Sequence, residues 1–447
     1  MVLRHIIFVV ILGLAASGIF VCFFPSPTSS PDAAQYDRIA YNLASGNGYS
    51  LSEQAPFVRT MFREPAYPVF LAIIYRIAGH VPTAALIVQM ALHAATAVLA
   101  YLIAKDAFGE RCAFFSAIAV SVFPTLANTA AYLLSETFFT FILCLGLWLY
   151  IVAMKSGRLA LFILSGAIFG LSALTKAALI FLPAVLISAA ILLMLAKRSV
   201  IKARPLNLIV FFAAFCILVS IWMVRNVELF NTPSLALRGG EALWSRAQKI
   251  DDPSRVVAAT ACFSISEFLG KSLFPDVTAR PERFLFKDFD KAVERRARYV
   301  AEGFTDQQID GIFIKEASGK ILKDPLKYVL YTPVEAIKMT AFTYLPFLNE
   351  KAVAGRFDSL SNGRFLLAAA RGASRLAAYP ILALFFVSIV RHLRDWDSWM
   401  FLFAITLYFN LMYSLLDAIG RYAVPLIPIY CIMAVSAFFP ADNRTGA

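Results

Sequence analysis

The sequence predicts an all-α polytopic membrane protein with about ten transmembrane helices, amphipathic external loop helices and one external α-rich subdomain. Hydrophobic residues make up 60% of the 447 residues, charged residues only 16%, and the mean hydropathy is +0.71. Soluble domains are about a quarter charged. Apolar runs of about 20 residues are therefore expected to cross a bilayer rather than fill a water-soluble core.

The first expected span is the apolar run 6–24, which follows the basic start Arg4–His5. The run is longer than the core of about 7–15 residues found in cleaved signal peptides, so an uncleaved helix is expected. The apolar stretch 67–79 is too short to cross and is interpreted as an interfacial or re-entrant segment. Nine further spans are expected at 82–104, 112–130, 135–154, 159–175, 177–196, 206–226, 373–390, 398–416 and 422–440.

The basic residues support this alternation. The net charge is +12, but Lys and Arg fall between apolar segments rather than in one patch, so nucleic acid is not expected as a partner. Cytoplasmic loops carry an excess of Lys and Arg. The expected inner connections hold the following basic groups: Lys105 and Arg111, Lys155 and Arg158, the run 197–204, Arg391 and Arg394, and Arg444. Both ends of the chain are thus predicted to lie on the inner, cytoplasmic side of a plasma (inner) membrane. Membrane lipids are among the expected partners.

Three domains follow from this topology. Residues 1–226 form a transmembrane module with a polar first external loop at 25–66, residues 227–365 an external subdomain, and residues 366–447 a C-terminal transmembrane module. The six cysteines show neither metal-ligand spacing nor a disulfide framework and are interpreted as small hydrophobic residues.

The first external loop contains a predicted amphipathic helix over 31–45. Ser30 suits its N-cap, Pro31 its first position and Gly46 the residue beyond its end. The apolar face carries Tyr36, Ile39, Ala40 and Leu43.

Asp32 falls at the start of that apolar face, and two interpretations remain open from the residues alone. It is either a first-turn acid favoured by the helix dipole or a partly desolvated carboxylate that acts as a general base. Asp37 points the other way and is interpreted as a solvated pair with Arg38.

Two further acids are candidates. Glu64 could form a surface ion pair or approach Asp32, and the two carboxylates could then hold a divalent metal, although no His accompanies them in the loop. Glu136 is either a helix start or a third acid facing the same cavity. His93 is interpreted as a hydrogen-bonded core histidine.

Four cations are candidates for a lipid phosphate. Lys176, Arg225 and Arg421 lie on the face that the charge rule leaves poor in basic residues, and Arg63 adjoins Glu64. Each could snorkel to the interface, but convergence on one face favours an anion held at headgroup depth.

These segments resemble the family 39-type glycosyltransferases of the C superfamily (GT-C), which include protein O-mannosyltransferases, the aminoarabinose transferase and rhizobial galacturonosyltransferases. The resemblance rests on the ordered set "PDAAQYDRIAYNLASGNGYS", "REPAYPVFLAIIY", "LLSETFFTFIL", "GLSALTKAALIFLP", "WMVRN" and "GRYAVPLIP". It implies that Asp32 is the catalytic base, that Glu64 assists metal or substrate binding, and that Lys176 replaces a common arginine. Many relatives carry a second acid where this chain has Ala33, and 227–365 holds no His for a metal site.

The expected function is transfer of a sugar from a polyprenyl-phosphate donor to a glycan, lipid or protein acceptor at the external face, with inversion implied by the resemblance. Asp32, Glu64 and Glu136 are the expected catalytic residues, and Arg63, Lys176, Arg225 and Arg421 the expected phosphate ligands. The alternatives are a transporter or flippase for a lipid-linked or anionic solute and a non-catalytic scaffold. No particular cofactor is predicted, and a divalent metal remains an open alternative.

Overall fold

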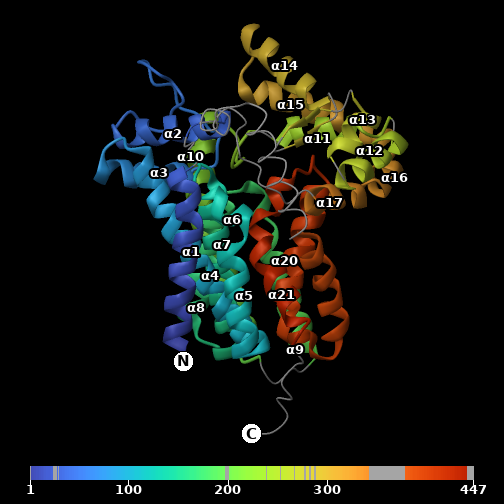
Figure 1. Ribbon diagram of the computed structural model, residues 1–447. Coiled ribbons are helices and arrows are strands. Elements are labelled where there is room, and N and C mark those ends of the chain that lie inside the picture. Colours follow the sequence, from blue (N-terminus) through green and yellow to red (C-terminus); the bar gives the residue numbers. More distant parts are fainter. Residues whose placement is uncertain are drawn as a thin grey trace.

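Apolar helices lie side by side in a bundle. Further helices pack together at one end of this bundle (Figure 1). The computed structural model describes residues 2–439 except 24–27, 29, 197–200, 238, 252, 266, 276–277, 281–282, 286–287 and 342–377. Within these ranges, five helical segments are long and apolar enough to span a membrane: α1 (Val2–Phe23), α4 (Pro82–Phe108), α7 (Ser135–Ser156), Ala177–Leu195 and α10 (Pro205–Phe230). The predicted membrane fold class is confirmed.

The remaining bundle helices are shorter or less apolar. They are α5 (Glu110–Val122), α6 (Pro124–Thr129), α8 (Leu159–Ala173), the helix Ala378–Arg391, α20 (Trp396–Ser414), η3 (Gly420–Leu426) and α21 (Ile427–Ser436). The segment Ala177–Leu195 consists of the 3-10 turn η1 (Ala177–Leu179) and α9 (Leu182–Leu195). The expected span 112–130 is divided into α5 and α6 at Pro124, because proline cannot continue the hydrogen-bond ladder of a helix.

Two glycines bring α8 and α10 into close contact. A Cβ at Gly166 would lie 2.2 Å from the carbonyl oxygen of Phe211, and one at Gly170 would lie 3.2 Å from Leu218 Cβ. Glycines four residues apart on one helix allow two backbones to approach within a membrane. This contact fixes α10, whose outer end adjoins the first loop.

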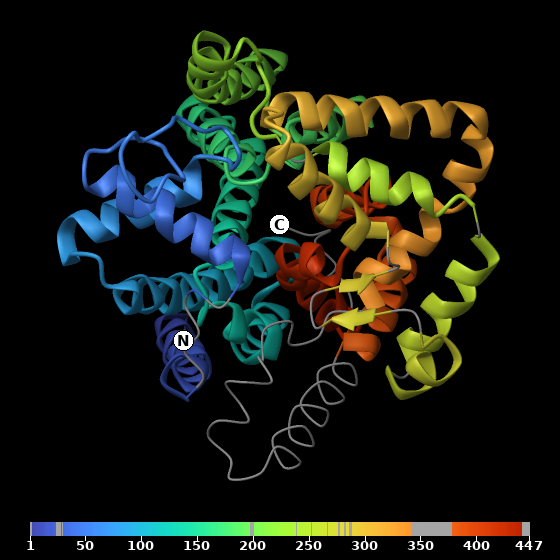
Figure 2. The same cartoon turned by 90° about the horizontal axis from the view of Figure 1, so that it is seen from above.

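The first loop supplies two helices at one end of the bundle: α2 (Pro31–Ala44) and α3 (Ala66–Ala78). They pack against each other, and α3 also contacts α4. The predicted loop helix is confirmed, and the apolar stretch 67–79, interpreted from the sequence as interfacial or re-entrant, forms most of the short helix α3. Seen from above, this loop and the second helical group lie over different sides of the bundle (Figure 2).

The second group corresponds to the expected external subdomain. Its helices are α11 (Gly239–Gln248), α12 (Pro253–Ile265), α13 (Glu267–Leu273), α14 (Asp288–Ala301), α15 (Asp306–Lys323), α16 (Pro325–Leu330) and α17 (Thr332–Ala341). The short antiparallel strands β1 (Thr278–Arg280) and β2 (Arg283–Leu285) interrupt them. Trp244, Phe313 and Ile309 lie in a small core separate from that of the bundle. Residues 342–365 of the expected subdomain lie outside the described residues.

The opposite end of the bundle gathers several of the expected inner connections. His5 and Lys105 both contact Glu110, and Lys155 Nζ donates to the carbonyl oxygen of Asp106 at 2.9 Å. The ends of α1, α4, α5 and α7 therefore meet away from the first loop, as the alternation predicts. Arg444 and residues 197–200 of the run 197–204 lie outside the described residues.

Candidate active site

Helix α2 holds the first-loop acid at its N-terminus. The Ser30 side chain accepts a hydrogen bond from the Ala33 backbone N–H at 3.2 Å, which is the N-cap that the sequence predicts. Tyr36, Ile39 and Ala40 are buried on the predicted face, and Leu43 is partly buried. This burial fixes the rotation of α2 and places Asp32, in its first turn, at the wall of a cavity.

Asp32 lies between two arginines. Its Oδ2 accepts from Arg421 Nη1 at 2.9 Å, and its Oδ1 accepts from Arg63 Nη2. Both guanidinium groups are buried, and Arg63 also donates through Nε to Gln35 Oε1 at 2.8 Å. Two neighbouring positive charges favour the ionised form of the Asp32 carboxyl group.

Arg421 continues this chain of charges to Glu136. Arg421 Nε donates to Glu136 Oε1 at 2.5 Å, and Lys176 Nζ donates to the same oxygen at 3.1 Å. Burial acts to lower the pKa of Lys176, but the neighbouring negative groups, chiefly the Glu136 carboxylate with Tyr36 and Glu64, together outweigh it and the pKa is raised. Lys176 therefore stays charged. The second oxygen of Glu136 is buried and accepts no hydrogen bond from the described residues.

Glu64 contributes to another part of the wall of the cavity that Asp32 lines. Its Oε1 accepts from the Ala177 backbone N–H at 3.2 Å, directly after Lys176. The Tyr49 hydroxyl donates to the carbonyl oxygens of Arg63 and Glu64, at 2.8 and 3.1 Å. These bonds shape the loop so that the Arg63 side chain points toward α2.

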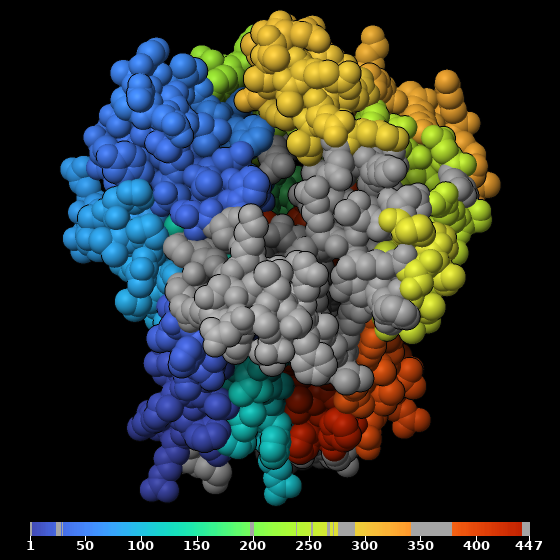
Figure 3. All heavy atoms as spheres, turned by 45° about the horizontal axis from the view of Figure 1, so that its top comes forward, coloured from blue at the N-terminus to red at the C-terminus, as the bar shows by residue number. Residues whose placement is uncertain are grey.

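A cavity of about 330 Å³ joins these groups at the end of the bundle that carries the first loop. In Figure 3 the first loop and α14–α15 face each other across this end of the molecule. The described side chains that line the cavity include Asp32, Tyr36, Phe62, Arg63, Glu64, Lys176, Glu241, Tyr413, Arg421 and Tyr422. Glu136 is not among the lining residues and lies behind Arg421 and Lys176.

Arg225 lies elsewhere. Its Nη1 donates to the carbonyl oxygen of Thr60 at 3.0 Å and to Asn226 Oδ1 at 2.7 Å, and its guanidinium lies over the ring of Trp222. Arg225 therefore holds the first loop against α10, and the structure does not bring it into the cavity with the other candidate cations.

The expected pairing of Asp37 with Arg38 is wrong. Asp37 Oδ1 accepts from the Tyr75 hydroxyl at 2.6 Å and contacts the His80 ring, whereas Arg38 pairs with Glu53 at 2.9 Å. Adjacent residues on a helix point in different directions, so each side chain finds a partner on another segment. His93 is a buried core histidine bonded to the Ser121 carbonyl oxygen, as expected.

The carboxylates do not fit a divalent metal. Among the described residues no three His, Cys, Asp or Glu side chains come together. Asp32 and Glu136 face Arg421, and Glu64 bonds to a backbone N–H. A metal ion would have to replace these cations, so we derive no step through a metal.

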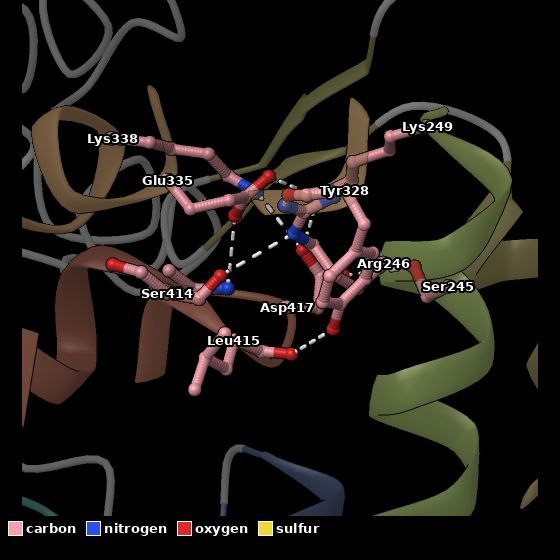
Figure 4. A network of polar contacts seen from close by, with 10 residues as sticks. Ser245, Arg246, Lys249, Tyr328, Glu335, Lys338, Ser414, Leu415 and Asp417 are labelled. Atoms are coloured by element: carbon pink, nitrogen blue, oxygen red, sulfur yellow. Dashed lines mark hydrogen bonds and ion pairs between the residues drawn. The ribbon is translucent and has the colours of Figure 1, made fainter. Parts of the chain in front are cut away.

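A buried charge network lies beside the site, and sequence reasoning missed it (Figure 4). Asp417 Oδ1 accepts from Lys249 and, at 3.0 Å, from Lys338, while Glu335 pairs with the same two lysines at 2.8 and 3.2 Å. Glu335 also accepts from the Ala418 backbone N–H at 3.0 Å. The network therefore ties α11 and α17 to the segment that leads into Arg421.

Burial acts to raise the pKa of Asp417, but the charges of Lys249 and Lys338 hold it well below its usual range. A depressed pKa means that this carboxylate stabilises the fold above the pKa of an unfolded Asp, about 3.9. That stabilisation is lost only as the pH falls further.

Asp417→Asn is expected to lower the free energy of unfolding by about 3–5 kcal/mol, because it leaves two buried lysines with one carboxylate. Thermal unfolding of the purified protein measures this. The matched control is Asp251→Asn, which breaks an exposed pair with Lys320 and should cost under about 1 kcal/mol. Equal unfolding temperatures for the two variants would show that the network contributes little.

Comparison with known proteins supports the resemblance seen in the sequence. A family model described as dolichyl-phosphate-mannose-protein mannosyltransferase matches residues 63–222. No curated protein matches the chain. A solved structure of the oligosaccharyltransferase AglB from Archaeoglobus fulgidus, with an inhibitory peptide and a dolichol-phosphate, aligns with a TM-score of 0.52 at 12% identity. The alignment covers 97% of this chain and 50% of AglB.

ArnT from Cupriavidus metallidurans, bound to undecaprenyl phosphate, aligns with a TM-score of 0.42 at 14% identity, over 95% of this chain and 77% of ArnT. The resemblance to glycosyltransferases of the C superfamily is thus confirmed, by the family match over 63–222 and by the fold shared with AglB. The chain spans about half the length of AglB.

Proposed function

We propose that this chain transfers a sugar from a polyprenyl-phosphate donor to a glycan, lipid or protein acceptor at the external face of the plasma (inner) membrane. The observation that carries the proposal is the position of Asp32, held between two arginines at the wall of a cavity. The dolichol-phosphate in the AglB complex supports a lipid-phosphate ligand for this fold.

In the proposed reaction Asp32 is the general base. Its carboxylate accepts the proton of the acceptor hydroxyl as that oxygen attacks the anomeric carbon of the sugar. The bond from this carbon to the phosphate oxygen breaks, the electron pair leaves with the polyprenyl phosphate, and attack opposite the leaving group inverts the anomeric carbon. A lipid phosphate is a good leaving group, so no strong general acid is required.

Arg421, Lys176 and Arg63 are the proposed ligands of the departing phosphate. All three line the cavity, and guanidinium–phosphate bonds are strong where water is excluded. Glu136 is proposed as a positioning residue, because it bonds to Arg421 and Lys176 from behind the cavity wall. Without a donor, the positive charges of the arginines and the lysine are balanced by carboxylates in contact with them.

Aromatic side chains supply a surface for the sugar. Tyr413 and Tyr422 stack with their ring centroids 4.3 Å apart, and both line the cavity. Glu241 of α11 lines the side of the cavity toward the external subdomain and pairs with Arg296 of α14. This wall is a candidate for acceptor selection.

The described ionisable residues of the site argue against a transporter. Transporters commonly place charged residues and broken helices near the bilayer midplane. Here Asp32, Glu64 and Lys176 lie on loops or at helix ends, at the end of the bundle that carries the first loop. A catalytic site at the membrane boundary explains this placement more directly.

Sugar transfer by the purified protein tests the proposal. The protein in nanodiscs is incubated with a panel of polyprenyl-phosphate monosaccharides and a membrane glycolipid extract, and both transferred sugar and released polyprenyl phosphate are measured. Release that depends on the acceptor is the expected result. Movement of intact donor across sealed vesicles, without its cleavage, would instead identify a flippase.

The external location of the site is tested by thiol labelling in intact cells. In a background carrying Cys22→Ala, Cys216→Ala and Cys262→Ser, cysteines that replace Gln54 and Glu302 are expected to react with an impermeant reagent. A cysteine that replaces Lys202, at the other end of the bundle, should react only after permeabilisation. All three positions are exposed. The reverse pattern would overturn the proposed orientation.

A further inference from the structure

One edge of the external subdomain exposes leucines beside unpaired lysines. We name it the α15–α16 edge and define it by Lys315, Leu322, Lys323, Leu326, Lys327, Val329 and Leu330. Leu322, Leu326 and Leu330 are 77%, 68% and 69% exposed, values unusual for large apolar side chains on one short segment. None of the three lysines forms an ion pair within the described part of the chain.

The acids near this edge are already engaged. Asp251 pairs with Lys320, Glu316 pairs with Arg295, and the Asp324 side chain caps α16 by accepting from the Lys327 backbone N–H at 3.1 Å. A cavity of about 1000 Å³ opens here, and four lysines are among its lining residues. The lysines that remain unpaired make the edge complementary to anions.

The position of α16 places the α15–α16 edge close to the end of the helical bundle. Tyr328 is the buried residue of this helix, and its hydroxyl donates to the carbonyl oxygen of Leu415, directly after the end of α20. Figure 1 shows α16 at the lower edge of the external subdomain, beside the upper end of the bundle. Leu411 of α20 and Leu415 directly after it are also exposed.

We propose that the α15–α16 edge docks on the outer surface of the bilayer, where its leucines enter the interfacial layer and its lysines contact anionic lipid headgroups. Apolar residues beside lysines on a short helical segment are typical of surface-bound elements, and each lysine near an anionic leaflet adds to the attraction. Since α15 packs on α11, which carries Glu241, docking would steady one wall of the cavity.

A fluorescent probe tests this directly. In a full-length background with Cys22→Ala, Cys216→Ala and Cys262→Ser, Leu326→Cys is labelled with an environment-sensitive fluorophore. The protein is placed in nanodiscs of phosphatidylcholine alone or of equal parts phosphatidylcholine and phosphatidylglycerol. The matched control is Val300→Cys, an apolar residue that is 54% exposed on α14, the helix drawn farthest from the bundle in Figure 1.

The expected result is blue-shifted emission from position 326 and quenching by lipids spin-labelled near the headgroup, several-fold stronger than at position 300. The quenching should be greater with phosphatidylglycerol and should fall in the combined variant Lys315→Gln, Lys323→Gln and Lys327→Gln, or at high salt. These substitutions are on the surface, and unchanged thermal unfolding confirms the fold.

Three results would overturn the proposal. The first is a probe at position 326 that stays unquenched in both membranes. The second is quenching of the same strength in both membranes and in the lysine variant. That result would mean that the edge contacts the membrane through its apolar residues alone. If emission changes with a soluble anionic glycan and not with phosphatidylglycerol, the edge binds acceptor and the docking proposal is wrong.

Discussion

Asp32→Asn is expected to lower sugar transfer by about 10²–10⁴-fold, because the amide keeps the shape of the side chain but cannot accept the proton of the acceptor hydroxyl. The cost should fall on turnover rather than on apparent donor affinity, since Arg421 and Lys176 remain in place. Initial rates of polyprenyl-phosphate release at several donor concentrations measure both quantities.

The matched control for this prediction is Asp37→Asn on the same helix. Asp37 accepts from the Tyr75 hydroxyl, and an asparagine oxygen at that position can still accept this bond. Most activity should remain. An Asp32→Asn protein as active as the Asp37→Asn protein would reduce Asp32 to a helix-terminal acid and contradict the mechanism.

Arg421→Lys is expected to produce the second large effect. Lysine keeps the positive charge but cannot bridge Asp32 and Glu136 with separate nitrogens, as Nη1 and Nε of Arg421 do. The loss of one charge-assisted hydrogen bond costs roughly 1.5–3 kcal/mol. This corresponds to a rate of sugar transfer that is lower by roughly 10–150-fold, whether the donor is saturating or limiting.

Donor titration shows where this loss falls. Apparent donor affinity and turnover should both decline for Arg421→Lys, whereas Arg225→Lys should change donor affinity much less, because Arg225 contacts Thr60 rather than the cavity. Circular dichroism and thermal unfolding separate these effects from a loss of fold. Equal donor titration curves for the two variants would remove Arg421 from the proposed phosphate site.

Local signals in the sequence predicted the first-loop helix well. The cap at Ser30, the proline at the first position and the apolar face each depend on residues that lie within about four positions of one another. Such short-range effects are visible in the sequence itself. Alternation of apolar runs and basic loops likewise predicted the membrane fold. An apolar helix satisfies its backbone hydrogen bonds within its own segment, so each span can be recognised by itself.

Partners distant in the chain could not be predicted in the same way. Asp32 and Arg421 are separated by 389 residues, and the sequence placed both at one face without showing that they touch. The partners of Asp37 and Arg225 were not predicted for a related reason. Each has a plausible neighbour or face in the sequence, but side-chain direction within the fold gives it another partner.

The buried network was missed because its members look like surface residues in amphipathic segments. Lys249 and Lys338 are charged residues near helix ends, and only the docking of α11 and α17 on the segment around Asp417 removes them from water. Burial of this kind depends on tertiary packing, which has no periodic signal in the sequence.

A structure of the protein with polyprenyl phosphate bound tests the central claim most directly. We expect the phosphate to lie in the 330 Å³ cavity, with its oxygens within about 3 Å of Arg421 and Lys176 nitrogens and with the Asp32 carboxylate free to face the acceptor side. Phosphate density at Arg225 or at the α15–α16 edge, with the cavity closed by the Asp32–Arg421 pair, would contradict it.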